Sequence, residues 1–143
     1  MIKTLYTGGS FDIFHFGHMN FLKNCRVISD EIIVALNTDE FINEYKGSPP
    51  IMTYEERKKT LLLSNYVDAV IPNDGGFDSK PAILSIKPKI IAIGDDWAKK
   101  DYYKQMNFTQ EWLDENNIVL VYIPYTKGIS SSELKERIKK YEK

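Results

Sequence analysis

The only two histidines of the chain, His15 and His18, lie three residues apart, directly after the glycine-containing segment Thr7–Asp12. Glycines that follow a strand let the backbone approach a ligand, and a helix N-terminus offers free N–H groups to an anion. In a first helical turn the two imidazoles face the same side, and Gly17 between them leaves room for a phosphate. Without a nearby third His, Cys or well-spaced carboxylate, they make a poor tetrahedral zinc site. The pattern therefore favours phosphate chemistry, with a structural role as the alternative for either ring.

A second anion-binding segment is expected near the end of the chain. Tyr125–Ser132 contains a Gly-x-Ser-Ser-Ser run that opens a helix, so free N–H groups are again available. Ser130 is expected to cap this helix, while Ser131 and Ser132 offer hydroxyls to a ligand. An ordinary helix cap is the alternative. In the first segment, Asp12 is expected to support the loop or a histidine, although aspartate is also a common turn residue.

These segments need elements that bring them together. Short apolar runs predict strands at residues 2–6, 31–36, 69–71, 90–93 and 119–123. Amphipathic stretches predict helices at about 17–28, from 53 onward, near 79–86 and at 131–141. Two helix starts carry the capping-box pattern, formed by Thr53–Glu56 and Ser130–Glu133. The last helix is expected to bury its apolar residues Leu134, Ile138 and Tyr141.

Strands that are apolar on both faces and alternate with helices predict a parallel sheet covered on both sides. The fold class is expected to be α/β: a Rossmann-like three-layer α/β/α arrangement with a five-stranded, mostly parallel sheet, in one domain spanning 1–143. In such sheets ligands bind beyond the carboxyl ends of the strands, where the strand order reverses. Three segments follow strands there: Thr7–Asp12, Gly94–Trp97 and Tyr125–Ser132. The polar segment Ala98–Asn107 is interpreted as a loop able to form a lid.

The composition excludes several classes of protein. The 143 residues are 43% hydrophobic, which suits one compact core, and the net charge of −1 shows no basic excess for a nucleic-acid partner. The single cysteine, Cys25, excludes an internal disulfide, and its apolar surroundings predict a buried, inert thiol in a reducing compartment. No leader pattern is apparent, and no apolar run approaches the ~20 residues needed to span a bilayer. A cytoplasmic protein without membrane contact is expected.

Two motifs and the blocks between them resemble those of a known family. The run Gly9–His18, which reads GSFDIFHFGH, resembles the H-x-G-H signature of the cytidylyltransferases, and Thr126–Ser132 is similar to their second signature. Between them, in family order, lie Lys46-Gly47, Tyr54–Arg57, Tyr66–Asp68 and Gly94–Trp97. An H-x-G-H alone is shared with adenylyltransferases and class I aminoacyl-tRNA synthetases, but this resemblance covers almost the whole chain. The chain is identified as a member of this family and resembles in particular the bacterial glycerol-3-phosphate cytidylyltransferases.

The resemblance implies that a phosphate ester attacks the α-phosphorus of CTP, that pyrophosphate leaves and that a CDP-alcohol forms. The nucleophile is already an anion, so positioning and charge neutralisation suffice. The catalytic residues would be His15 and His18, which donate to phosphate oxygens, and Lys46, on a flexible loop. Mg²⁺ is expected to arrive with the nucleotide phosphates, because no carboxylate cluster is apparent to hold it. Family membership also implies a homodimer, formed through Tyr66–Asp68.

The other residues expected in the site fall into two groups. The nucleotide and its phosphates are assigned to Thr7, Gly8, Gly9, Ser10, Phe11, Gly17, Arg57, Gly94, Asp96, Thr126, Gly128, Ile129, Ser130, Ser131 and Ser132. The acceptor would be a phosphorylated small alcohol, glycerol 3-phosphate or a related polyol phosphate. It is assigned to Asp12, Asp95, Trp97, Phe77 and Tyr125.

The chain departs from the family pattern at several positions. Tyr125 and Asn65 stand where the family has arginine, which removes two groups suited to bidentate phosphate contact. Lys127 replaces a glutamate, and Phe77 replaces a tryptophan. The segment Lys99–Asn117 looks longer than in relatives, and its aromatic residues either line an acceptor lid or pack under a loop: Tyr102, Tyr103 and Trp112. Two alternatives stay open, an adenylyltransferase acting on a sugar phosphate or cofactor precursor and a nucleotide-binding module without turnover.

Overall fold

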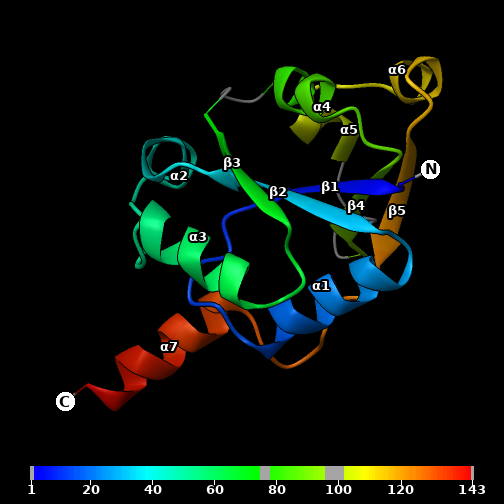
Figure 1. Ribbon diagram of the computed structural model, residues 1–143. Helices are drawn as coiled ribbons and strands as arrows, with labels where there is room; N and C mark the ends of the chain where they lie inside the picture. Colours follow the sequence, from blue (N-terminus) through cyan, green and yellow to red (C-terminus); the bar gives the residue numbers. More distant parts are fainter. Residues whose placement is uncertain (1, 75–77, 96–101, 143) are drawn as a thin grey trace.

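The computed structural model describes residues 2–74, 78–95 and 102–142 (Figure 1). Its elements follow one another in the order β1 (Thr4–Gly9), α1 (Phe16–Val27), β2 (Glu31–Asn37), α2 (Asp39–Lys46), α3 (Tyr54–Leu63), β3 (Ala69–Asn73), α4 (Lys80–Ile86), β4 (Ile90–Gly94), α5 (Tyr102–Met106), α6 (Gln110–Glu115), β5 (Val119–Ile123) and α7 (Ser131–Tyr141). Strands and helices alternate through most of the chain, as the hydrophobic pattern predicts.

The five strands form one sheet in the order β3-β2-β1-β4-β5, and every neighbouring pair is parallel. The central strand β1 pairs with β2 along its whole length and with β4 through Leu5 and Tyr6. The strand order therefore reverses between β1 and β4, whose carboxyl ends form the switch point of the sheet. The expected Rossmann-like fold is confirmed, with all five strands parallel.

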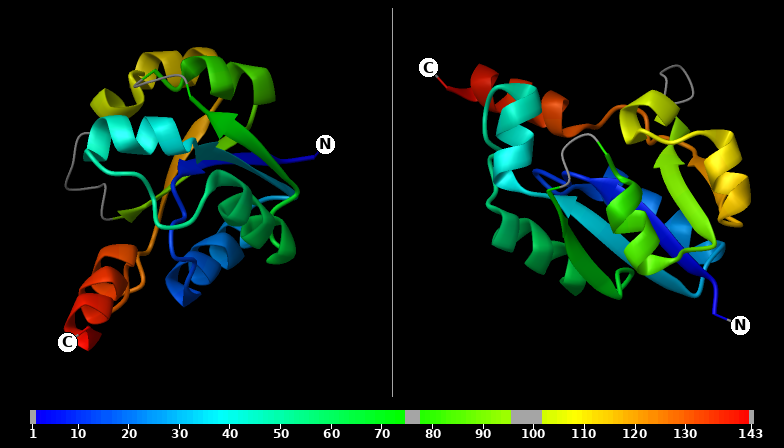
Figure 2. Two further views of the ribbon diagram at one scale, coloured as in Figure 1. Left: turned by 90° about the vertical axis from the view of Figure 1, so that its left-hand side faces the viewer. Right: turned by 90° about the horizontal axis from the view of Figure 1, so that it is seen from above.

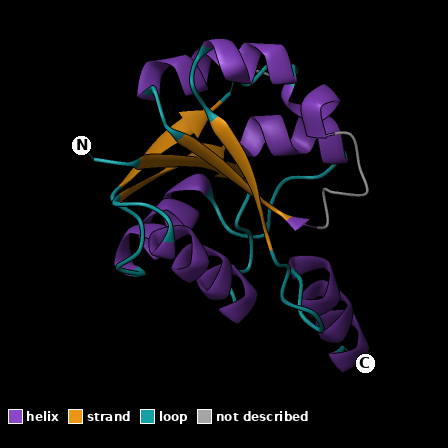
Figure 3. Cartoon of the chain, turned by 90° about the vertical axis from the view of Figure 1, so that its right-hand side faces the viewer, coloured by secondary structure: helices purple, strands orange, loops and turns teal. Residues whose placement is uncertain are grey.

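Helices cover both faces of this sheet, which gives the expected three layers (Figures 1, 2 and 3). Consecutive residues Leu5 and Tyr6 point to opposite faces, and each belongs to a separate core cluster. The first cluster includes Leu61 of α3, and the second includes Ile83 of α4. Cys25 lies in the first cluster, where burial raises the pKa of its thiol to about 12. The expectation of a buried, inert thiol is therefore confirmed.

The helix α2 was missed by the sequence interpretation, which placed Lys46 on a loop. The Thr38 hydroxyl caps α2 by accepting from the N–H of Phe41 at 3.2 Å, and Gly47, at φ +77°, ends it. Phe41 and Ile42 are its only buried residues, so the apolar pattern was too short to indicate a helix. Lys46 is therefore the last residue of α2, and its exposed side chain starts from a fixed backbone.

The final helix, α7, also differs from the expectation. Ser130 caps it by accepting from the N–H of Glu133 at 3.0 Å, but the Glu133 carboxylate accepts from Arg137, so the reciprocal half of the capping box is absent. No residue of α7 is buried, and Ile138 and Tyr141 are 52% and 90% exposed. Figures 1 and 3 show the helix extending away from the sheet. The expected burial of its apolar stripe is wrong, because no other described element covers it.

Two short helices, α5 and α6, occupy the described part of the segment that was interpreted as a loop or lid. The ring of Phe108 stacks on Trp112, with centroids 5.7 Å apart, and meets Tyr103 edge-on at 5.9 Å. Tyr103 and Trp112 pack against the core cluster that contains Ile83. The structure therefore favours aromatic packing over a lid lining for these two residues.

Candidate active site

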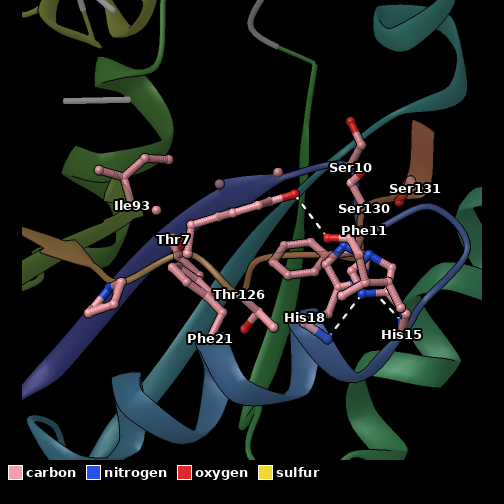
Figure 4. A pocket seen from close by; sticks show the side chains of 17 residues that line it. Thr7, Ser10, Phe11, His15, His18, Phe21, Ile93, Thr126, Ser130 and Ser131 are labelled. Atoms are coloured by element: carbon pink, nitrogen blue, oxygen red, sulfur yellow. Dashed lines mark hydrogen bonds between the residues drawn. The ribbon is translucent and has the colours of Figure 1, made fainter. Parts of the chain in front are cut away.

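A cleft of about 210 Å³ lies at the carboxyl ends of β1 and β4, where the switch-point rule places a ligand (Figure 4). The expected site residues that line it are Thr7, Gly8, Gly9, Ser10, Phe11, His15, Gly17, His18, Gly94, Tyr125, Thr126, Ile129, Ser130 and Ser131. Phe21, Ile93 and Pro124 also line the cleft, without having been expected, and make part of its wall apolar. Segments from both ends of the chain thus meet in one cleft, as the topology predicts.

Both imidazoles take part in capping α1. His15 is the N-cap residue, and its Nδ1 accepts a hydrogen bond from the N–H of Gly17 at 3.0 Å. Nδ1 of His18 accepts from the backbone N–H of His15 at 3.2 Å, which completes a capping box. The two rings stack, with centroids 3.9 Å apart (Figure 4). Because each Nδ1 is an acceptor, a neutral ring carries its proton on Nε2.

The surroundings of the two rings hold them neutral. Burial lowers the pKa of His18 to about 3; repulsion from His15 acts in the same direction, and attraction to Asp12 opposes it. Phe11 and Phe14 enclose the His18 ring, with centroids at 5.3 and 5.2 Å. Burial also lowers the pKa of His15. At neutral pH the pair therefore presents Nε2–H donors and no positive charge.

Gly17 makes room for a ring, where the sequence indicated room for a phosphate. A Cβ at this position would lie 2.8 Å from Cε1 and 2.9 Å from Nδ1 of His15, and 3.3 Å from Cγ2 of Ile129. The two contacts with the His15 ring are shorter than a Cβ tolerates, so the ring would have to move, and the contact with Ile129 is tight. The missing side chain therefore preserves the position of His15 and its capping bond.

Asp12 supports the loop before α1 and is not free to bind an acceptor. Its side chain is 4% exposed and accepts from the backbone N–H groups of Ile51 and Met52 at 2.8 and 2.9 Å. The ammonium of Lys135 lies 3.4 Å from the same carboxylate. Burial by itself would raise the pKa of Asp12, but these bonds and the Lys135 charge outweigh it and hold the pKa below its usual value. The expected support of the loop is confirmed, and the carboxylate oxygens that were assigned to the acceptor are occupied by these partners.

The N-terminus of α7 borders the cleft next to the loop that carries the histidines. The Ser131 hydroxyl donates to the backbone carbonyl of Asp12, which joins two loops far apart in sequence. Ser130 lines the cleft and caps the helix. Gly128, at φ +86°, forms the preceding turn, and Ser132 is exposed; neither lines the cleft. The proton of the Ser131 hydroxyl is therefore used within the chain, and the hydroxyl donor that this helix end offers to the cleft is that of Ser130.

Arg57, which was assigned to the nucleotide and its phosphates, is fully buried and does not line the cleft. Its Nε donates to the carbonyl of Met52 at 3.0 Å, and its Nη1 donates to the carbonyls of Ser10 and Asn37 at 2.9 and 2.8 Å. Its Nη2 lies 2.5 Å from the carboxylate of Asp39. The guanidinium thus joins three segments of the chain and fixes the backbone of Ser10 at the cleft.

Two other expected residues, Lys46 and Asp95, lie outside the lining of the cleft, to which Tyr125 belongs. Nζ of Lys46 lies 5.8 Å from the ring centroid of Tyr45. The carboxylate of Asp95 accepts from the N–H of Tyr125 at 2.8 Å and so joins the ends of β4 and β5. The hydroxyl of Tyr125 donates to the carbonyl of Ile129 at 3.1 Å. Three expected residues lie outside the described part of the chain: Phe77, Asp96 and Trp97.

A polar cluster that the sequence did not indicate adjoins the cleft. The side chains of Ser10, Asn37 and Tyr45 are joined by hydrogen bonds of 3.0 to 3.4 Å. Asn37 ends β2, so the rule that ligands gather at strand ends was the one available signal, and nothing local marked Tyr45. Within the described ranges, no group of three or more His, Cys, Asp or Glu side chains is placed to hold a metal ion.

The cleft lies at the switch point of a parallel sheet and brings together neutral N–H donors, glycines and two helix N-termini. These features are typical of an α/β protein that binds a phosphorylated ligand. The family model described as cytidylyltransferase-like matches residues 6–137. The chain therefore belongs to the cytidylyltransferase-like family and is a nucleotidyltransferase, as the two motifs indicated.

Individual relatives agree with this assignment. The chain is 35% identical over 138 residues to the glycerol-3-phosphate cytidylyltransferase of Bacillus subtilis (strain 168), covering 96% of this chain and 98% of the relative. It is 43% identical over 89 residues to the FAD synthase of Pyrococcus abyssi, covering 62% and 60%. Among solved structures, the lipopolysaccharide core biosynthesis protein from Thermoplasma volcanium superposes with a TM-score of 0.70 at 26% identity, over 90% of this chain and 100% of that one.

Proposed function

We propose that this nucleotidyltransferase transfers CMP from CTP to a phosphorylated small alcohol, glycerol 3-phosphate or a related polyol phosphate. A phosphate oxygen of the alcohol forms a bond to the α-phosphorus of CTP, the bond to the bridging oxygen breaks, and pyrophosphate leaves with that electron pair. The products are a CDP-alcohol and pyrophosphate. The observation that carries the proposal is the pair of neutral imidazoles, whose rings border the cleft at the switch point of the sheet.

The proposed reaction requires little proton transfer by the protein. The attacking phosphate is an anion, so no general base is needed, and catalysis consists of orientation and stabilisation of the charge that develops on phosphate oxygens. His15 and His18 donate to those oxygens from Nε2, and the N-termini of α1 and α7 add their free N–H groups. Lys46, exposed at the end of α2, supplies a mobile positive charge.

A magnesium ion is proposed to enter with the nucleotide. The carboxylate of Asp12, in the histidine loop, is already bound to three backbone N–H groups and to Lys135, so it does not fit a direct metal ligand. The nucleotide phosphates would therefore hold the Mg²⁺ and this chain would hold the phosphates. Bound there, the ion neutralises charge on the departing pyrophosphate.

The identity of the acceptor and of the nucleotide's base is the most specific part of the proposal. Relatives named glycerol-3-phosphate cytidylyltransferase match over nearly the whole chain, whereas the FAD synthase relatives match over 62% of it or somewhat more. The first group supports CTP and a polyol phosphate. The second keeps an adenylyltransferase as the competing candidate, which would use ATP and a different acceptor.

Pyrophosphate release measures both candidates at once. The chain is incubated with Mg²⁺, with CTP, ATP or UTP, and with a panel of phosphorylated polyols, sugar phosphates and phosphorylated cofactor precursors. We expect release with CTP and at least one polyol phosphate. Release with ATP alone would support the competing candidate, and no release with any pair would refute both.

A variant at His15 separates catalysis from folding. His15→Asn retains a side-chain oxygen that can cap α1, because asparagine is a strong N-cap residue, but it removes the Nε2–H donor. We expect about a 100-fold lower rate with an unchanged melting temperature. Lys139→Ala, at an exposed position on α7, is the control and should match the parent enzyme.

Two further sequence-based expectations stay predictions, namely a homodimer formed through Tyr66–Asp68 and a cytoplasmic location. Asp68 is engaged within the chain, because Arg26 lies 3.1 Å from its carboxylate. Size-exclusion chromatography with light scattering measures the oligomeric state directly. None of the described helices is long and apolar enough to cross a membrane.

A further inference from the structure

The cluster of Ser10, Asn37 and Tyr45 is not used by the chemistry described so far. Ser10 follows β1 and lines the cleft that contains the histidines. Asn37 ends β2, and Tyr45 lies in α2 directly before Lys46. In Figure 4 the Ser10 hydroxyl points away from the rings of His15 and His18. The cluster therefore extends the cleft toward α2, on the side where Lys46 lies.

The orientation of the Asn37 amide follows from its neighbours. The amide nitrogen of Asn73 donates to Oδ1 of Asn37 at 2.9 Å. The Nδ2 of Asn37 consequently faces the other way and donates to the Ser10 hydroxyl at 3.0 Å and to the Tyr45 hydroxyl at 3.4 Å. Asn37 is 9% exposed, and its backbone carbonyl accepts from the buried guanidinium of Arg57. The amide is thus a fixed pair of donors aimed at two hydroxyl oxygens.

The hydroxyls of Ser10 and Tyr45 are 3.0 Å apart, and either of them can donate to the other. Each hydroxyl has one proton and two lone pairs. The two amide bonds and the bond between the hydroxyls use three of the four lone pairs and one of the two protons. Among the described residues, one O–H and one lone pair remain without a partner.

One free donor beside one free acceptor matches the chemistry of a ligand hydroxyl, which donates and accepts at the same time. A phosphate oxygen would accept the free O–H but would place its negative charge against the free lone pair. An ammonium group would leave the O–H unused. The cluster is therefore better suited to an alcohol than to a charged group.

Resting on the proposed function, we propose that Ser10, Tyr45 and Asn37 form the subsite that reads a hydroxyl of the acceptor. A phosphorylated polyol would place its phosphate near the histidines and Lys46 and a carbon-bound hydroxyl between Ser10 and Tyr45. Asn37 is a positioning residue that holds both hydroxyls in place. The subsite selects polyol phosphates against alkyl phosphates of similar size.

The test compares two substitutions across two classes of acceptor. Tyr45→Phe removes one hydroxyl and keeps the ring, which packs on Phe41 at 5.0 Å and lies beside Lys46. With glycerol 3-phosphate or ribitol 5-phosphate as acceptor, we expect kcat/KM to fall about 5- to 10-fold, as for one lost neutral hydrogen bond. With n-propyl phosphate, kcat/KM should stay the same, and so should the KM for CTP. Tyr141→Phe, which alters an exposed ring at the end of α7, is the matched control.

Ser10→Ala supplies the second variant. It should reproduce the selective loss, and the double variant with Tyr45→Phe should lose little more than either single one, because the two hydroxyls act on one ligand group. An equal loss for polyol and alkyl phosphates, or no loss for either, would overturn the subsite.

A binding measurement separates this inference from the proposed transfer reaction. The same acceptors are titrated calorimetrically into the CTP-bound protein, which requires no turnover. Preferential binding of the polyol phosphates that is lost in Tyr45→Phe supports the subsite even if no pyrophosphate is released. No binding of the polyol phosphates, or equal affinity for both classes of ester, refutes it whatever the reaction proves to be.

Discussion

Replacement of Arg57 by leucine tests whether this arginine supports the fold or binds the nucleotide. The substitution removes hydrogen bonds to the carbonyls of Met52, Ser10 and Asn37 and the ion pair with Asp39. A buried acceptor left without its donor costs about 1–3 kcal/mol. The Asp39 side chain is 37% exposed and regains water, so its share is small. With each carbonyl taken near the lower limit, Arg57→Leu should cost about 3–5 kcal/mol of unfolding free energy.

A loss of this size is a large part of the stability of a small domain. Urea denaturation followed by circular dichroism measures it as a lower midpoint at an unchanged m-value. Arg57→Lys keeps the charge but not the planar fork, so about half of the loss is expected. Lys139→Leu, which removes an exposed ion pair on α7, should leave the midpoint where it is.

The affinity for CTP decides between the two roles. Because Arg57 does not line the cleft, Arg57→Lys should bind CTP within about 3-fold of the parent protein, measured well below the unfolding midpoint. A variant of unchanged stability that binds CTP more than about 10-fold more weakly would mean that the guanidinium reaches the phosphates. That result would refute the structural role argued from its burial.

Three further predictions concern the histidine loop. Gly17→Ala should displace the ring of His15, lower the free energy of unfolding by about 1–3 kcal/mol and abolish most of the transferase rate. A normal melting temperature and a normal rate of pyrophosphate release would contradict the packing argument. The pKa of His18 is about 3 in the folded chain and about 6.5 in the unfolded one, so the unfolded state takes up the proton first as the pH falls. The free energy of unfolding should therefore have its full value above about pH 6.5 and decline by roughly 2–4 kcal/mol toward pH 3. Urea midpoints that fall just as much in His18→Gln would oppose this prediction. Asp12→Asn should lower the free energy of unfolding by about 1–3 kcal/mol at pH 7, because it weakens the bonds to the backbone N–H groups and removes the ion pair with Lys135. It should also flatten the decline in stability below about pH 4, because a carboxyl group with a lowered pKa stabilises the fold only above that pH. An unchanged urea midpoint at pH 7 would show that the loop needs no carboxylate.

Local patterns in the chain were sufficient for most of the architecture. Apolar runs such as Ile32–Leu36 indicated buried strands, and the Thr53–Glu56 capping box marked the start of α3 correctly. Both are short-range signals, because a strand or a cap is specified by residues within a few positions of one another. The helix α2 is amphipathic, but with eight residues and two buried side chains its pattern is too short to separate a helix from a loop by sequence alone.

The stripe on α7 illustrates the opposite limit. Ile138 has the spacing of a buried helix residue, and this spacing predicts burial, but its side chain is exposed. A periodic pattern shows that a helix has an apolar face, but not whether another element lies against it. The exposure of that face depends on where β5 directs the chain, which is a property of the whole sheet.

For the histidine pair, some properties follow from the sequence and others only from the tertiary structure. Their types, their spacing and the glycines before them indicated phosphate chemistry from the linear order alone, because donors on one helical turn must lie together. Folding decided their tautomer and their neutral charge, since both depend on capping bonds and on enclosing phenylalanine rings. It also engaged Arg57 and Asp12, both assigned to ligands, in hydrogen bonds within the chain. A charged side chain looks the same in a sequence whether it faces a cleft or is buried, and only the packing of distant segments settles which partners use its hydrogen-bonding capacity.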